Sequence, residues 1–121
     1  MRRFRSNAER QQGGLVLLTL GGEIDLANAS QLRSDLFEQL PNTVRGAVLD
    51  LSGVSYFDSA AVRLVFELAE TLRRHGQRLR LVVPRGSLAR EVIEHVALDA
   101  VVPVDEDREV SLESLRTEVE R

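Results

Sequence analysis

The chain has 121 residues, of which 43% are hydrophobic and 29% charged, with a net charge of −3 and no cysteine. These values are typical of one soluble domain, and they exclude disulfides, thiolate catalysis and thiolate metal sites. The basic residues are all arginine and are scattered among acidic residues rather than gathered into a stripe, which argues against nucleic acid as a partner.

The start of the chain and its two histidines argue against a signal peptide and a histidine metal site. No apolar run approaches the roughly 20 residues that a membrane span requires, and the first residues lack the apolar core of a signal peptide. His75 and His95 stand far apart in the sequence and share no metal-ligand spacing. We therefore expect a cytoplasmic chain that has no membrane segment and needs no metal or other cofactor.

The first part of the chain predicts two strands and a helix. Met1 to Asn7 is expected to form a short edge strand, followed by a turn over Ala8 to Gly14. Leu15 to Leu20 is almost continuously apolar and too short for a helix, which predicts a central strand buried on both faces. Apolar residues near helical spacing then predict a first helix that ends before Pro41, and these residues are Leu26, Ala29, Leu32, Leu36 and Leu40.

A second strand and a long helix follow. Val44 to Leu51 is another apolar run and predicts a strand, from which Ser52 to Asp58 carries the chain out of the sheet. Ser59 to His75 predicts a helix, because it has an apolar stripe and is followed by Gly76, a typical left-handed C-terminal cap. The stripe consists of Val62, Val65, Phe66, Ala69 and Leu72.

The last part of the chain predicts two further strands and two helices. Arg78 to Val83 alternates and then runs apolar into Pro84, as a strand near a sheet edge does. Ser87 can cap a third helix. Ala100 to Val104 predicts a last short strand, and Asp105 to Asp107 precedes a final helix. The apolar residues expected to face inward are Leu88, Val92, Ile93 and Val96 in the third helix, and Val110, Leu112, Leu115 and Val119 in the final helix.

This alternation of strands and helices predicts an α/β fold. Crossover connections imply a mostly parallel sheet of about five strands with about four helices, and the N-terminal hairpin makes one edge antiparallel. In such sheets the functional face usually lies at the carboxyl ends of the strands. Gly21 to Asp25 and Ser52 to Ser59 are both expected to emerge there.

Two fragments resemble the paired signatures of the anti-sigma factor antagonist family, whose fold is the STAS domain. They read GGEIDLANASQL from Gly21 and VLDLSGVSYFDSAAV from Val48, and the order of elements agrees over nearly the whole chain. The resemblance implies one STAS domain over residues 1–121 that binds an anti-sigma factor of the serine-kinase type, releases its sigma factor, and is regulated by phosphorylation. By position, the phosphorylated serine is Ser59, with Asp58 before it and Asp25 nearby.

The sequence departs from the family pattern directly after Ser59. Ala60 and Ala61 replace a second serine or threonine and a glycine, and Arg63 and Glu67 stand where small residues are common. The two alanines favour the start of the helix, since alanine is better than glycine by roughly 1 kcal/mol per position, and they stiffen the step that a kinase must engage. The residues expected to contact a partner are Asp25, Asp58, Ser59, Ala60, Ala61, Arg63 and Leu64.

These residues also have simpler explanations. Ser59 can be an N-cap or first-turn residue worth about 1 kcal/mol, or a phosphoacceptor whose modification adds about −1.5 to −2 charge at pH 7. Asp25 can be the N-cap of the first helix, with a role in the site only if its loop lies against Ser59. Leu64 and Leu68 lie off the main stripe, which indicates extra core contacts unless they prove exposed and form an apolar patch.

Two other functions stay open. A scaffold subunit, as STAS domains are in some ATP-driven transporters and stress-sensing assemblies, would keep the fold without the switch. A phospho-aspartate receiver could use Asp50, but receivers rely on an acidic pair and a late lysine, and this chain has no lysine. Motifs of hydrolases and nucleotide enzymes are also missing, so we expect no enzymatic activity. We expect a monomer or a weak dimer.

Overall fold

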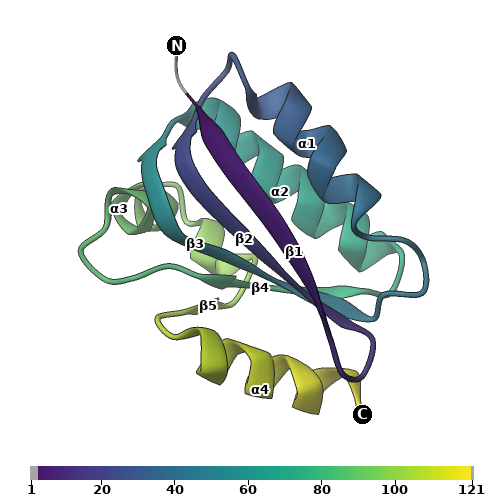
Figure 1. The fold of residues 1–121 in the computed structure, drawn as a ribbon. Helices are drawn as coiled ribbons and strands as arrows, with labels where there is room; N and C mark the ends of the chain where they lie inside the picture. Colours follow the sequence, from purple (N-terminus) through teal and green to yellow (C-terminus); the bar gives the residue numbers. More distant parts are fainter. Residues whose placement is uncertain (1–2, 121) are drawn as a thin grey trace.

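The computed structural model describes residues 3–120, which form a mixed sheet of five strands in the order β1-β2-β3-β4-β5 (Figure 1). β1 pairs with β2 antiparallel, and the other neighbours pair in parallel, as the sequence predicts. Met1 and Arg2, the first residues of the predicted edge strand, lie outside the described residues. The strands are β1 Phe4–Gln11, β2 Leu15–Ile24, β3 Gly46–Phe57, β4 Arg78–Val82 and β5 Val104–Asp105.

The helices cover the two faces of the sheet unequally. Three of them pack on one face over the larger of two apolar clusters, whereas the C-terminal helix packs on the other face over the smaller cluster (Figure 1). The central strands are therefore buried on both faces. The helices are α1 Ala29–Glu38, α2 Ser59–Arg74, α3 Leu88–His95 and α4 Arg108–Val119, and a single 3-10 turn, η1, spans Leu98–Ala100.

All three N-terminal strands extend beyond their predicted ends. β1 runs on to Gln11, through much of the predicted turn, because it pairs with β2 in unbroken register. β2 continues through Gly21 and Gly22 to Ile24, and β3 continues to Phe57. Register shifts between β2 and β3 accompany the glycines, and Gly22 has a φ of 87°, which a residue with a side chain rarely adopts. The extension keeps both strands paired up to the point where they lead into helices.

Two further predictions, the start of the first helix and the position of the last strand, are also wrong. The first helix begins at Ala29 rather than near Leu26, whose side chain is 80% exposed. The predicted strand over Ala100 to Val104 is mostly a turn, and only its last residue belongs to β5. Ala97 adopts a left-handed conformation that ends the α3 segment, so the chain turns sharply before it reaches the sheet.

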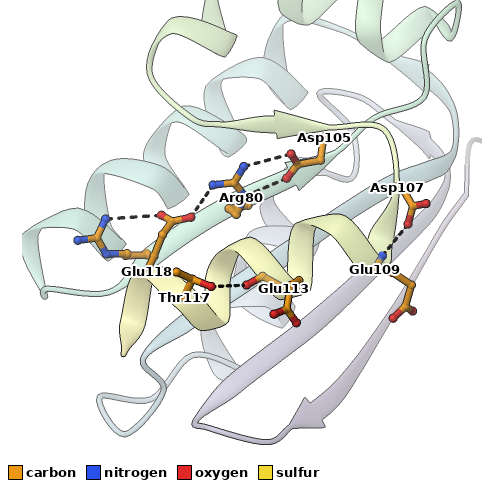
Figure 2. Close-up of polar contacts among 8 residues, drawn as sticks. Arg80, Asp105, Asp107, Glu109, Glu113, Thr117 and Glu118 are labelled. Atoms are coloured by element: carbon orange, nitrogen blue, oxygen red, sulfur yellow. Dashed lines mark hydrogen bonds and ion pairs between the residues drawn. The ribbon is translucent and has the colours of Figure 1, made fainter. Parts of the chain in front are cut away.

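α4 is anchored to the sheet edge by an ion-pair network that Figure 2 shows. The guanidinium of Arg80 on β4 donates to both carboxylate oxygens of Asp105, at 2.8 and 3.1 Å, and to Glu118 on α4. Arg80 is mostly buried, with 15% of its side chain exposed. The Asp105 and Glu118 carboxylates raise the pKa of Arg80 above its ordinary value even though its burial lowers it. The network therefore fixes the C-terminal helix against β4 and β5.

Candidate functional site

Ser59 lies at the step from β3 into α2, where its side chain is exposed. It is the first residue of the helix and not its cap, because the preceding residue has extended backbone and supplies the cap. The Asp58 Oδ1 accepts hydrogen bonds from the backbone N–H groups of Ala60 at 2.9 Å and Ala61 at 3.2 Å. Asp58 thus satisfies two of the helix's free amides and leaves the Ser59 hydroxyl available to solvent.

Asp25 organises the loop that leads from β2 into α1. Its Oδ1 accepts from the backbone N–H of Ala27 at 2.9 Å and of Asn28 at 3.2 Å. The Asn28 side chain accepts from the Asp25 N–H through Oδ1 and donates to the Glu23 C=O through Nδ2. Asn28, not Asp25, is the residue at the N-cap position of α1, so the predicted capping role is wrong. Asp25 and Asn28 are both buried. The loop is consequently a closed turn that pushes Leu26 outward.

The two segments meet in space. Ile24 is paired with Phe57 at the ends of the neighbouring strands, and the Leu26 N–H donates to Asp58 Oδ2 at 3.3 Å. Asp58 therefore binds the helix amides with one oxygen and the Asp25 loop with the other. The predicted convergence of Gly21 to Asp25 with Ser52 to Ser59 is confirmed, and it places exposed Leu26 on the same end of the sheet as Ser59.

An apolar groove runs from Ser59 along α2. It has a volume of about 590 Å³ and lies between α2 and the segment that joins α3 to η1. Phe66, Val96 and Val101 contribute exposed apolar surface to it, with 41%, 46% and 54% of each residue exposed. Exposed apolar surface gathered in a groove is typical of a protein-binding site. The lining residues are Ser59, Val62, Arg63, Phe66, Glu67, Glu70, Val96, Ala97, Leu98 and Val101.

The structure divides the predicted contact residues into two groups. Asp58, Ser59, Ala60 and Arg63 lie at the start of α2 with accessible surface. Asp25, Ala61 and Leu64 are buried, at 8%, 0% and 5% exposure. Ala61 and Leu64 belong to the apolar core, together with Leu68. The core interpretation of Leu64 and Leu68 is therefore correct, whereas contact of the predicted residues with a partner stays a prediction.

Sequence reasoning missed the apolar groove because it assigned Phe66 to the inward stripe of α2. The inward face is rotated toward Ala61, Leu64 and Leu68, and Phe66 points to its outer side. Leu88 and Val96, predicted to face inward from the third helix, and Val110 of the final helix are likewise exposed. The signal that could have revealed Phe66 is the excess of apolar positions on α2, which are too many for one helix face.

Glu67, another residue at which the sequence departs from the family pattern, links α2 to α1. Its carboxylate lies 2.7 Å from the Arg33 guanidinium, and hydrogen bonding by Arg33 lowers the pKa of Glu67 below its ordinary value. Arg33 also lies over the Phe37 ring, 4.7 Å from its centroid. Both charged side chains are substantially exposed, so this pair contributes little to stability and chiefly defines the charge beside the groove.

Asp50 sits away from this site, on the sheet face that α4 covers. It is 3% exposed, accepts from the Ser52 hydroxyl at 2.6 Å, and lies 2.7 Å from the Arg108 guanidinium. Burial by itself would raise the pKa of Asp50, but the hydrogen bonds from Ser52 and Arg108 outweigh it and leave the pKa below its ordinary value. Asp50 is a structural anchor for α4, a simpler role than that of a phosphoacceptor.

Residues 3–120 lack two further classes of site. No group of three histidine, cysteine, aspartate or glutamate side chains in this range could hold a metal ion. None of the helices described is both long enough and apolar enough to cross a membrane.

Three comparisons with known proteins agree on one family. Residues 7–111 match the family model of the STAS domain. The chain is 32% identical over 108 residues to BtrV of Bordetella bronchiseptica, a candidate anti-sigma factor antagonist, covering 89% of this chain and 92% of BtrV. It is 36% identical over 87 residues to the anti-sigma-F factor antagonist RsfB of Mycobacterium tuberculosis, covering 71% and 69%. The crystal structure of an anti-sigma factor antagonist from Mycobacterium paratuberculosis superposes with a TM-score of 0.85 at 21% identity, covering 94% of this chain and 95% of that one.

Proposed function

Because the chain belongs to the STAS domain family and resembles its anti-sigma factor antagonists, we propose that it binds an anti-sigma factor and thereby frees the sigma factor that the latter holds. The observation that carries this proposal is the hydrogen bond from the Leu26 N–H to Asp58 Oδ2, which joins the Asp25 loop to the start of α2. It supports a single continuous docking face, which comprises Leu26, Ser59 and the apolar groove.

The chemistry of this face favours a protein partner. Leu26, Phe66 and Val101 are large apolar side chains that expose 80%, 41% and 54% of their surface. Burying such side chains on binding is favourable by roughly 25 cal/mol per Å² of apolar surface, and aromatic residues often contribute most of the energy. The carboxylates around the groove are partly neutralised within the chain, since Glu67 pairs with Arg33 and Glu70 pairs with Arg73.

We further propose that phosphorylation of Ser59 by an anti-sigma factor of the serine-kinase type reverses this binding. A phosphate there would add about −1.5 to −2 charge at pH 7, beside the Asp58 carboxylate and at the mouth of an apolar groove. The helix dipole would stabilise that phosphate within the chain, so the modification need not unfold α2. A partner surface that buries the groove would have to desolvate the new charge, which weakens binding.

Arg63 adds a positive charge beside the proposed phosphorylation site. It stands one helical turn after Ser59 and lines the same groove, the i and i+4 spacing at which opposite charges attract. In the unmodified protein, Arg63 offers a positive charge to an acidic group on the partner. In the phosphorylated protein, the same guanidinium would be drawn toward the phosphate and become less available.

The groove is tested by measuring the affinity of the protein for a cognate serine-kinase anti-sigma factor. Phe66→Ser should weaken binding at least about tenfold, because it removes the aromatic side chain from the groove. Val110→Ser is the matched control, since Val110 is 54% exposed on α4, far from the groove. Equal affinity of both variants would reject the groove as the docking site.

The modification is tested by incubating the protein with the same anti-sigma factor and ATP, followed by mass spectrometry of the tryptic peptides. Incorporation of one phosphate into the wild type and none into Ser59→Ala is the expected result. Phosphate on another residue, or none on the wild type, would reject Ser59 as the target. Ser59→Ala must retain binding to the anti-sigma factor, because Asp58 rather than Ser59 caps the helix.

A further inference from the structure

β1 is an edge strand whose outer side has no partner strand within residues 3–120. It pairs with β2 over its whole length, from Phe4 opposite Gly22 to Gln11 opposite Leu15, without a bulge or a proline (Figure 1). The opposite edge of the sheet differs, because β5 has only two residues. An edge strand of this length presents a row of backbone groups that a further strand can pair with.

The hydrogen-bond pattern shows which groups point outward. The Glu23 N–H donates to the Arg3 C=O at 2.8 Å, so these two residues form a hydrogen-bonded pair of the antiparallel ladder. Such pairs alternate along the strand, which assigns the odd-numbered residues of β1 to the bonds with β2. The even-numbered residues therefore direct their N–H and C=O groups away from the sheet, and they are Phe4, Ser6, Ala8 and Arg10.

The side chains of β1 are complementary to a reversed copy of the same strand. If a second β1 lies antiparallel about Asn7, Arg5 of each strand stands opposite Glu9 of the other, twice across the two-fold axis. All three side chains are exposed and project from the same face of the strand. They also occupy non-hydrogen-bonded pairs, in which opposite side chains are closest. Moving the axis to Ala8 replaces both ion pairs with contacts between Asn7 and Glu9.

The even-numbered residues fit the same register. Ser6 stands opposite Ala8, and their outward backbone groups pair, while Phe4 stands opposite Arg10, an arrangement that permits a cation–π contact. A two-fold axis about Ser6 would also join opposite charges, but it would need Arg3, which precedes β1, and would pair only the shorter stretch from Phe4 to Ala8. The axis through Asn7 uses seven consecutive residues of the strand.

From this complementarity we propose that β1 is the interface of a symmetric dimer, in which two copies of this chain join their sheets through antiparallel β1 strands centred on Asn7. The charges that deter unspecific edge pairing here select one register of self-pairing. The two-fold axis makes the strands of one copy run antiparallel to the corresponding strands of the other. The two docking faces therefore lie at opposite ends of the joined sheet. The dimer therefore leaves both faces accessible, and its test is independent of the proposed function.

Cross-linking tests the register directly, because the native chain has no cysteine. In the proposed dimer the two Asn7 Cα atoms are about 4.5 Å apart, within the range that a disulfide spans. Asn7→Cys should form a covalent dimer under mild oxidation. Glu9→Cys is the matched control, since its two copies would be separated by four residues along the strands, roughly 13 Å. Equal cross-linking of both variants, or none of Asn7→Cys, would overturn the proposal.

Charge-reversal substitutions test the same interface without a covalent bond. The measurement is sedimentation of the full chain over a range of concentrations. Arg5→Glu and Glu9→Arg should each raise the dissociation constant of the homodimer about tenfold or more, because each places like charges opposite each other twice. Mixing the two variants should restore a dimer, since every pair is then complementary. Glu120→Arg changes the charge equally at the far end of α4 and should dimerise like the wild type. A monomeric wild type, or a mixture no stronger than its components, would refute the pairing.

Discussion

Asp58 makes two separable contributions, and substitutions can resolve them. Its Oδ1 caps α2 through the Ala60 and Ala61 amides, whereas its Oδ2 accepts from the Leu26 N–H of the neighbouring loop. Asp58→Asn keeps a carbonyl oxygen for the cap but places an NH₂ group where Leu26 needs an acceptor. Asp58→Ala removes both functions. The pair of variants therefore separates the helix cap from the connection between the two segments.

The expected sizes follow from the geometry. Loss of the cap costs about 1 kcal/mol, and loss of a partly exposed hydrogen bond to Leu26 costs about 0.5–1 kcal/mol. Asp58→Ala should therefore lower the free energy of unfolding by about 2 kcal/mol. Asp58→Asn should lower it by about 1 kcal/mol, which includes the weaker interaction of a neutral side chain with the helix dipole.

Urea unfolding at pH 7 measures these free energies, and amide hydrogen exchange of Leu26 reports the connection itself. Exchange at Leu26 should accelerate in both variants, while exchange in the first turn of α2 should accelerate much more in Asp58→Ala. Asp107→Ala is a useful control, because Asp107 caps another helix, α4, by accepting a hydrogen bond from the Glu109 N–H (Figure 2). Unchanged Leu26 exchange in Asp58→Asn would refute the role of Oδ2, and wild-type stability of Asp58→Ala would refute the cap.

Three further substitutions test the packing and electrostatics of the fold. Arg108→Met should lower the free energy of unfolding by about 1–2 kcal/mol at pH 7, because the lowered pKa of Asp50 stabilises the protein above its unfolded pKa of about 3.9. This difference should shrink as the pH falls below about 4 through the folded pKa, and a constant difference in urea unfolding down to pH 3 would contradict it. Leu68→Ala should cost about 2–5 kcal/mol in the same assay, since Leu68 is fully buried, and a cost below 1 kcal/mol would contradict its core position. Gly76→Ala should lower the free energy of unfolding by about 1–2 kcal/mol through its φ of 72° alone, as open space surrounds the site; a stabilising effect would contradict this assignment.

The order of elements and most helix ends could be predicted from the sequence, because local chemistry determines them. Asp107 and Ser87 accept from backbone amides at the starts of their helices, and Gly76 follows α2 in a left-handed conformation. These features need only a few neighbouring residues, so a sequence pattern is enough to reveal them.

The strand ends and the groove could not be predicted in the same way, because they depend on contacts between distant segments. β3 continues to Phe57 since β2 pairs with it there, through glycines that the sequence alone indicates as a turn. Phe66 is exposed because Leu64 and Leu68 occupy the inward face of α2. The convergence of the Asp25 loop with Ser59 was predictable from the topology of the sheet, but the hydrogen bond through Asp58 was not.

Release of a sigma factor tests the proposed function most directly. A complex of a cognate serine-kinase anti-sigma factor with its sigma factor is titrated with the wild-type chain, Ser59→Ala or Ser59→Asp, and free sigma factor is quantified. The wild type and Ser59→Ala should displace the sigma factor, and Ser59→Asp should do so at least about tenfold less effectively, because its carboxylate stands beside Asp58 at the mouth of the groove. Equal displacement by all three proteins would contradict the switch, and displacement by none would contradict the antagonist function itself.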